Sequence, residues 1–279
     1  MCENIIEIFS SIQGEGKYVG CRQIFVRLEG CNLDCAYCDT ENEVGRHRIC
    51  MVEEEAGSHK LSAHQNPLSA ERVAELIEHV AAGVPHHSLS ITGGEPLLHV
   101  PFIQALASCV RLPIFLETNG TLDEALAECI EDISIISMDI KLPSVLSRPV
   151  WEAHARFLEI ARRKDVYVKI VVAAETEETE VEKAAHLVAD IAPRTLLILS
   201  SGYCSMCVVC PSACYPVRWV QCTNTGALAA LSKHCTVVSF RCAHYTTDAS
   251  YDEFAVEQSF YAVYSCGEST IYDTVDFFD

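Results

Sequence analysis

Three cysteines near the N-terminus have the spacing of an iron–sulfur cluster site. Cys31, Cys35 and Cys38 form a CxxxCxxC pattern within residues 30–40. Iron–sulfur clusters usually take four cysteine ligands, so three close thiolates without an evident fourth leave one iron open to another ligand. A structural zinc site is the alternative, but zinc sites favour paired CxxC or Cys/His groups and close all four positions. The spacing therefore favours a 4Fe-4S cluster whose open iron binds a substrate or a cofactor.

The composition limits the class of protein to which these cysteines belong. The chain has 279 residues, 16 cysteines and a formal net charge of −19. We find neither a basic leader nor a long apolar run, so we expect a cytoplasmic protein without a membrane partner. Cysteines in that compartment indicate metal or redox chemistry rather than disulfides. The acidic charge argues against a nucleic-acid partner, because phosphate binding needs clustered Lys and Arg.

Strand-type and helix-type segments alternate along residues 1–199. Six short apolar runs predict strands at residues 23–28, 89–91, 114–116, 133–138, 166–172 and 196–199. Between them, apolar side chains recur at helical spacing, as at Val73, Leu76, Ile77 and Val80. Thr-x-x-Glu capping boxes at Thr121 and Thr179 predict two helix starts. This order predicts an α/β fold with a parallel sheet, in the form of an incomplete (β/α)6 TIM-like barrel.

Polar loops follow four of the predicted strands. The cysteine loop follows the first, Thr92-Gly-Gly-Glu-Pro96 the second and Glu117-Thr-Asn-Gly-Thr121 the third, while Ser137-Met-Asp-Ile-Lys141 ends the fourth. Each loop alone could be an ordinary turn, since Gly, Asn and Pro are common in turns. In parallel α/β folds, however, ligands bind at the carboxyl edge of the sheet. Four such loops predict that the chemistry lies at this edge.

The cysteine motif and the Gly93-Gly-Glu-Pro96 motif together resemble the radical S-adenosylmethionine (SAM) superfamily. Within that superfamily the chain, over residues 1 to about 199, resembles the 7-carboxy-7-deazaguanine synthases. The segments that carry this resemblance are Ser10-Ser-Ile-Gln-Gly-Glu-Gly16, Phe25-Val-Arg-Leu28, Gly30-Cys-Asn-Leu33, Cys38-Asp-Thr40, Glu117-Thr-Asn-Gly120 and Asp139-Ile-Lys-Leu-Pro143. The resemblance implies a radical SAM partial barrel. It also implies a lyase that converts 6-carboxy-5,6,7,8-tetrahydropterin to 7-carboxy-7-deazaguanine with loss of ammonia, towards queuosine or archaeosine.

The SAM site is assigned to three segments. Glycines in the Gly93-Gly-Glu-Pro96 motif let the backbone approach a ligand closely, and Glu95 supplies a carboxylate suited to a cationic amine. As the resemblance implies, further contacts lie along the cysteine loop and at the end of the fourth strand. The assigned residues, with Glu95, are Ala36, Tyr37, Cys38, Gly93, Gly94, Ser137, Met138, Asp139 and Lys141.

The substrate site is assigned around Arg27 and Gln13. Arg27 can form a bidentate pair with a carboxylate, and Gln13 offers a donor and an acceptor to a pterin edge. A surface ion pair with Glu29 or another acid is the alternative for Arg27. The resemblance adds Ile12, Gly14 and Thr92, and it assigns Thr40 to Mg²⁺, a cation that commonly combines few protein ligands with ligand oxygens and water.

The resemblance also implies a reaction course and partners. The cluster receives an electron from flavodoxin or ferredoxin and binds SAM, and the resulting 5′-deoxyadenosyl radical abstracts a hydrogen from C6 of the pterin. The ring then contracts, ammonia leaves and SAM is regenerated, in an enzyme expected to be a homodimer. Because the cofactors break the bonds, we expect no acid–base pair or nucleophile triad.

Two other functions remain open from the sequence. A glycyl-radical-enzyme activase shares the cysteine trio and the Gly-Gly-Glu-Pro motif, but it acts on a protein backbone and does not need Gln13 and Arg27 to hold a small molecule. A non-catalytic metal-binding scaffold would bind zinc and would not cleave SAM.

Two segments depart from the regular pattern. The polar stretch 41–67 lacks periodicity and predicts an insertion or a lid with solvated histidines. Residues 200–279 contain thirteen of the 22 aromatic residues but only three Lys or Arg. Their composition and loss of the family pattern favour a frameshifted or mispredicted gene end. A candidate auxiliary cluster is the alternative, because Cys204, Cys207, Cys210 and Cys214 have a ferredoxin-like spacing, although Pro211 follows the third cysteine rather than the fourth.

Overall fold

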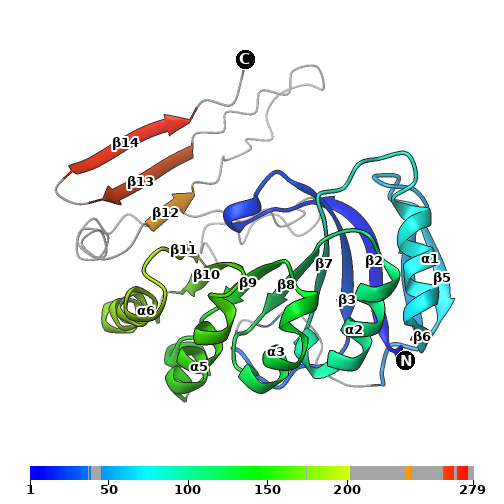
Figure 1. Ribbon diagram of the computed structural model, residues 1–279, viewed down its shortest axis with the longest axis horizontal. Coiled ribbons are helices and arrows are strands. Elements are labelled where there is room, and N and C mark those ends of the chain that lie inside the picture. Colours follow the sequence, from blue (N-terminus) through cyan, green and yellow to red (C-terminus); the bar gives the residue numbers. More distant parts are fainter. Residues whose placement is uncertain are drawn as a thin grey trace. The chain divides into compact units, whose positions relative to one another are not determined.

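The computed structural model describes residues 1–36, 38, 45–146, 148–173 and 175–201, together with three strands at 237–240, 260–266 and 269–275. The chain divides into two compact units, Met1–Val168 and Lys169–Asp279, and each is described by itself (Figure 1). The predicted division into residues 1–199 and 200–279 stays a prediction.

The first unit is built on a mixed sheet in the order β9-β8-β7-β3-β2-β4-β5. Strands β3, β7, β8 and β9 are parallel, whereas β2 pairs antiparallel to β3 and parallel to β4, and β5 closes the edge as a hairpin with β4. A separate small ladder joins β1 and β6. The strands are β1 Cys2–Glu3, β2 Ile5–Ile12, β3 Arg22–Leu28, β4 Ile49–Glu53, β5 Leu61–Gln65, β6 Leu68–Ser69, β7 Ser88–Gly93, β8 Ile114–Thr118 and β9 Ile135–Asp139.

Helices connect the parallel strands, as the sequence predicts. In Figure 1 the helices α1, α2, α3 and α5 stand in chain order beside the strands, and each contacts the next in this row. The apolar side chains that recur along these helices are buried. In α1 they include Val73, Leu76, Ile77 and Val80. The helices are α1 Ala70–Val80, α2 Val100–Cys109, α3 Asp123–Cys129, α4 Pro143–Leu146 and α5 Trp151–Ala161, with 3-10 turns at Gly16–Tyr18, Pro96–His99 and Ile130–Asp132.

The second unit begins within β10 (Asp165–Val172) and continues through α6 (Glu178–Ile191) and β11 (Leu196–Ser201). Strand β11 pairs parallel with β12 (Val237–Phe240), and β13 (Phe260–Cys266) pairs antiparallel with both β12 and β14 (Ser269–Val275). The candidate auxiliary-cluster residues Cys204, Cys207, Cys210 and Cys214 lie outside the described residues.

All six predicted strands are present, and the predicted α/β class is confirmed. They correspond to β3, β7, β8, β9, β10 and β11. Among the helices of the described part of the chain, we find none that is long and apolar enough to cross a bilayer.

Two local predictions were wrong, and one stretch is more regular than its sequence suggests. The stretch 41–67, predicted to be an insertion or a lid, contains the β4–β5 hairpin, whose alternation is weak because β5 is a half-exposed edge strand. Thr121 does not cap α3, which begins after Leu122 without a side-chain cap. Thr179 lies inside α6, and the capping box there is formed by Glu177 and Glu180. Glutamate at both positions supplied the same reciprocal hydrogen bonds that Thr-x-x-Glu would have made.

Candidate active site

The two faces of the parallel strands differ in chemistry. In β3, Ile24, Val26 and Leu28 are fully buried, while the alternate residues Gln23 and Arg27 point to the other face. Register places Gln23 beside Ser88 and Arg27 beside Thr92 of β7, and Glu117 of β8 beside Ser137 of β9. This second side also carries Phe25 and Phe115. Its polar side chains are together called the polar face, which is defined by Gln23, Arg27, Ser88, Ser90, Thr92, Glu117 and Ser137.

The cysteine loop is held against the Gly-Gly-Glu-Pro loop by main-chain contacts. The amide of Glu95 donates to the carbonyl of Gly30 at 2.8 Å, and the amide of Gly94 donates to the carbonyl of Leu28 at 3.3 Å. A Cβ atom at position 94 would lie 2.1 Å from the Gly30 oxygen and 2.9 Å from the Cβ of Cys31. Only glycine permits this approach, so the two motifs must form one unit.

The three cysteines have the environment of a cluster site. Cys31 and Cys35 are partly exposed and Cys38 is exposed. Burial raises the pKa of Cys35 to about 11, Lys141 opposes this, and the neighbouring thiols of Cys31 and Cys38 raise it further. Cys35 therefore lies close enough to both other thiols to interact with them electrostatically, and metal binding would displace its proton.

The donor set fits a cluster better than a single ion. Among the described residues, we find no three His, Cys, Asp or Glu side chains placed to hold one metal ion. A four-iron cluster takes each cysteine on a different iron, so its sulfur ligands do not need to converge on one point. Three thiols on one loop therefore fit a 4Fe-4S cluster.

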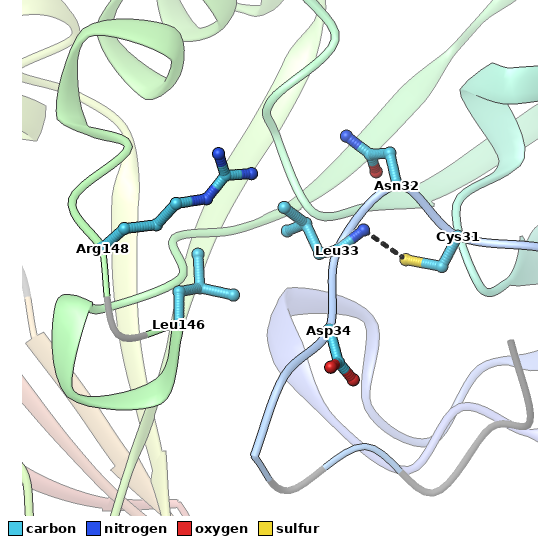
Figure 2. A pocket seen from close by; sticks show the side chains of 6 residues that line it. All are labelled: Cys31, Asn32, Leu33, Asp34, Leu146 and Arg148. Carbon is cyan, nitrogen blue, oxygen red and sulfur yellow. Dashed lines mark hydrogen bonds between the residues drawn. The ribbon is translucent and has the colours of Figure 1, made fainter.

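A cavity of about 420 Å³ lies beside Cys31. Figure 2 shows Cys31, Asn32, Leu33 and Asp34 along one wall, with Leu146 and Arg148 facing them from the segment after β9. The amide of Ala36 donates to the carbonyl of Val145 at 3.2 Å, which ties the cysteine loop to this segment. Room for a ligand is thus present at the first cysteine.

Glu95 is not among the residues that line this cavity. Its carboxylate is fully buried and accepts hydrogen bonds from the amide of Leu97, the hydroxyl of Thr118 and the amide of Asn119. Burial raises its pKa to about 7 although these bonds favour the charged form. The side chain holds the loop after β8, and the predicted contact of this carboxylate with the SAM amine stays a prediction. A contact through the backbone of Gly93 and Gly94 stays a prediction.

Asn119 is held in place by Glu95, whose carboxylate accepts from the Asn119 backbone amide. The side-chain nitrogen of Asn119 donates to the side-chain oxygen of Asn32 at 2.8 Å and lies 3.9 Å from the sulfur of Cys31. The hydroxyl of Thr121 donates to the side-chain oxygen of Asn119 at 2.6 Å. The sequence pointed to this loop as a whole but not to Asn119, whose contact with the cysteine loop depends on the fold.

The end of β9 carries buried polar atoms that a ligand could satisfy. Lys141 and Asp139 form an ion pair at 2.8 Å, and both influence the pKa of Cys35. The hydroxyl of Ser137 and one carboxylate oxygen of Asp139 are buried without a hydrogen-bond partner among the described residues. Unpaired buried polar atoms are rare in proteins, so they favour a ligand rich in hydroxyl or amine groups here. This agrees with the SAM assignment of Ser137, Asp139 and Lys141, which stays a prediction, as does that of buried Met138.

Gln13 lies on the polar face and is bound to Glu117. Its side-chain nitrogen donates to the oxygen of Gln23 at 3.0 Å and to the carboxylate of Glu117 at 2.8 Å. The hydroxyls of Ser90 and Thr92 also donate to this carboxylate, at 3.4 and 3.3 Å. Glu117 therefore joins two predicted substrate residues, Gln13 and Thr92. Sequence reasoning did not assign Glu117 to the site, although a carboxylate directly after the apolar run 114–116 was a usable signal.

The other predicted substrate residues differ in their surroundings. Arg27 forms an ion pair at 2.7 Å with Glu7 of the neighbouring strand, and both side chains are about one-third exposed, at 31% and 37%. This is the surface-pair alternative, with Glu7 in place of Glu29. Ile12 is 47% exposed, and a Cβ at Gly14 would have no neighbour within 4 Å. Space for a ligand is thus open beside Gln13.

Glu29, by contrast, is a buried structural carboxylate. It accepts hydrogen bonds from Asn4 and from the amides of Gly45, Arg46 and His47, which lower its pKa to about 2 although burial alone would raise it. His47 therefore is not a solvated loop residue as expected. The predicted site residues Tyr37 and Thr40 lie outside the described residues.

Comparison with known proteins defines the class first. The radical SAM superfamily model matches residues 25–188, so this chain belongs to the radical SAM superfamily. It is 43% identical over 198 residues to the 7-carboxy-7-deazaguanine synthase of Geobacter sulfurreducens, covering 69% of this chain and 79% of that protein. The synthase of Archaeoglobus fulgidus is 35% identical over 195 residues, covering 67% and 79%. The chain belongs to the 7-carboxy-7-deazaguanine synthase family.

A solved structure was also found. The chain is similar to the crystal structure of QueE from Escherichia coli with 24% identity and a TM-score of 0.49, over 72% of this chain and 85% of that one.

The predicted family and enzyme class are thus confirmed. Membership implies a 4Fe-4S cluster and SAM as cofactors, a small-molecule substrate and a reductant.

Proposed function

We propose that this protein converts 6-carboxy-5,6,7,8-tetrahydropterin to 7-carboxy-7-deazaguanine with release of ammonia, as a step of 7-deazapurine biosynthesis. The observation that carries the proposal is the hydrogen-bonded group on the polar face, in which Gln13, Ser90 and Thr92 all donate to Glu117. A family that acts on a small heterocycle needs such a group beside the cluster loop.

The chemistry of this group suits a pterin. The pyrimidine half of a pterin presents N–H donors next to a carbonyl acceptor. A carboxylate accepts such donors, while hydroxyl and amide groups serve either role. Glu117 therefore takes the donor edge. The side-chain oxygen of Gln13 accepts from the amide of Glu15 at 3.3 Å and has a second lone pair for the ring. Buried polar side chains that already bond one another fix the orientation of the ring with little reorganisation.

Arg27 is assigned to the substrate carboxylate. The guanidinium now pairs with Glu7 in a partly exposed ion pair, and such pairs contribute little to stability. A carboxylate-bearing substrate can therefore replace Glu7 at small cost. The bidentate geometry of arginine then orients the substrate as well as binding it.

The cofactors are assigned to the remaining loops. Cys31, Cys35 and Cys38 would hold the cluster, and the end of β9 would hold SAM through Ser137, Asp139 and Lys141. When bound, the reduced cluster and SAM supply the radical that abstracts a hydrogen from the substrate. The protein side chains orient the substrate and exclude water, so no acid–base pair is required.

Further assignments are carried by family resemblance. We include Mg²⁺ on Thr40 beside the substrate carboxylate, the SAM contacts of Ala36, Tyr37 and Cys38, and the substrate contacts of Ile12 and Gly14. We also include a homodimer, flavodoxin or ferredoxin as electron donor, and a cytoplasmic location.

Anaerobic turnover tests the proposed function. The reconstituted protein is incubated with SAM, dithionite and 6-carboxy-5,6,7,8-tetrahydropterin, with a sample lacking SAM as the control. We expect 7-carboxy-7-deazaguanine by mass spectrometry only in the complete sample. Release of 5′-deoxyadenosine without this product would contradict the proposed substrate and would favour the activase alternative. Bound zinc without a four-iron absorbance would favour the metal scaffold.

A further inference from the structure

A buried histidine on α5 bridges two loops of the site. His154 is fully buried, its Nδ1 lies 2.9 Å from the carbonyl oxygen of Gly120, and its Nε2 lies 3.0 Å from the backbone nitrogen of Lys141. The amide of Lys141 can only donate, so Nε2 must be the unprotonated nitrogen and Nδ1 must donate to Gly120. The imidazole is therefore neutral and in one tautomer.

Each partner of His154 belongs to a loop that reaches the cysteines. Gly120 follows Asn119, whose side chain lies against Cys31 and Asn32. Lys141 forms the ion pair with Asp139 and lowers the pKa of Cys35. One side chain thus links the loop beside Cys31 to the loop beside Cys35.

The packing around His154 leaves it little freedom. Gly120 has a positive φ of 66°, and a Cβ there would lie 2.8 Å from the side chain of Met138 and 3.3 Å from Nδ1 of His154. Burial lowers the pKa of His154, and the charged groups that act on it are Asp139 and Lys141. A neutral imidazole at this point accepts from the Lys141 amide and donates to the Gly120 carbonyl at the same time.

We propose that His154 is a positioning residue for the SAM site, which holds the loop of Lys141 and Asp139 in register with the loop of Asn119 and Gly120. The inference rests on the SAM site of the proposed function and not on its pterin substrate. It gives α5 a role in cofactor binding, although no side chain of that helix was expected in the site.

Two conservative variants separate positioning from simple packing. In His154→Gln, the side-chain oxygen can replace Nε2 and accept from the Lys141 amide, whereas in His154→Asn the side-chain nitrogen replaces Nδ1 and the Lys141 amide loses its acceptor. The matched control is Leu158→Val, a change at another fully buried position of the same helix. For each reconstituted protein we measure the equilibrium affinity for SAM, the 5′-deoxyadenosine formed on reduction without pterin, and the melting temperature.

We expect SAM to bind about tenfold more weakly to His154→Asn, as the loss of one buried hydrogen bond implies. His154→Gln keeps the bond to the Lys141 loop and loses the donor to Gly120, so its affinity for SAM should fall between those of wild type and His154→Asn. Leu158→Val should bind SAM normally even where its melting temperature falls. Wild-type affinity in His154→Asn would overturn the inference. An affinity that simply follows the melting temperature across all three variants would also overturn it. Because no readout uses the pterin, an incorrect substrate assignment would leave the result unaffected.

Discussion

The two faces of the same parallel strands show which residues serve folding and which serve function. Toward the helices, β3 and β7 present Ile24, Val26, Leu89 and Ile91, all fully buried. The polar face carries Gln23, Ser88 and Ser90, which are also fully buried. Burying polar side chains is costly unless each finds a partner, so packing alone would favour apolar residues on both faces. The difference indicates that the polar face is kept for a ligand.

Removal of the cluster ligands should have the largest effect. The triple variant of Cys31, Cys35 and Cys38 to Ala should lose SAM cleavage entirely, because no protein ligand for the cluster would remain in this loop. Iron and sulfide analysis with absorbance spectroscopy measures the loss of the cluster, and 5′-deoxyadenosine formation measures the loss of SAM cleavage. Cys50→Ala is the matched control, since this cysteine is buried in β4 and should affect stability alone. A residual four-iron signal in the triple variant would instead establish a second cluster, for which Cys204 to Cys214 are the candidates.

Substitution of Glu117 tests the polar face directly. Glu117→Gln should lower kcat/KM for the pterin by about 100-fold, or about 2.7 kcal/mol of transition-state stabilisation, because an amide cannot accept all the donors that meet this carboxylate. SAM cleavage without substrate should be unchanged.

Ile91, on the side of β7 opposite the polar face, provides the control for Glu117. Ile91→Val should lower the free energy of unfolding by about 1 kcal/mol and leave turnover unchanged. Equal losses of turnover in both variants would show that the two faces do not differ in function.

Glu95 predicts a pH dependence of stability. Its pKa is raised to about 7 in the folded protein, so between about pH 4.5 and 7 the folded state binds a proton that the unfolded chain releases. Protonation of Glu95 therefore raises the free energy of unfolding, by at most about 3 kcal/mol. This stabilisation is fully present below about pH 4.5 and is lost as the pH rises toward 7.

Urea unfolding of the cluster-free protein measures this slope. Between about pH 5 and 8, the free energy of unfolding should fall less steeply with pH in Glu95→Gln than in the wild type, whatever the absolute stability of the variant. Parallel curves for the two proteins would show that Glu95 titrates normally, and the nearby groups Lys141 and Cys31 would then need to be examined.

A smaller effect is expected from a substitution where the Gly-Gly-Glu-Pro loop packs against the cysteine loop. Gly94→Ala should shift the cysteine loop at an overpacking cost of about 1–3 kcal/mol and shorten the time for which iron is retained under a chelator. Gly14→Ala is the control for iron retention, because its Cβ would meet open space. Equal retention in both variants would contradict the close packing at position 94.

Much of the fold could be predicted because the parallel strands are short apolar runs and the helices have regular apolar stripes. The β4–β5 hairpin could not, because an edge strand with one exposed face has little pattern. The two helix caps were predicted wrongly, because Glu177 takes the capping role expected of Thr179 and α3 begins without a side-chain cap. Local sequence does not distinguish these caps when several acceptors are adjacent.

The candidate site was predictable as a set of loops, but many of its contacts were not. The motifs showed that the cysteine loop and the Gly-Gly-Glu-Pro loop belong together. The inward turn of Glu95, the partner of Arg27, the central place of Glu117 and the bridge made by His154 all depend on strand register or on contacts between distant segments. Such contacts follow from the tertiary structure and leave no periodic signal in the chain.

Deuterium transfer tests most directly the central claim that the polar face presents a carboxypterin to a SAM-derived radical. The reconstituted enzyme is given substrate deuterated at C6 under anaerobic reduction, and SAM, 5′-deoxyadenosine and the deazapurine are analysed by mass spectrometry. We predict deuterium in SAM or 5′-deoxyadenosine together with 7-carboxy-7-deazaguanine, and formation of both at a rate about 100-fold lower in Glu117→Gln when the pterin is well below saturation. Formation of 5′-deoxyadenosine without deuterium, at the same rate with and without the pterin, would contradict the claim.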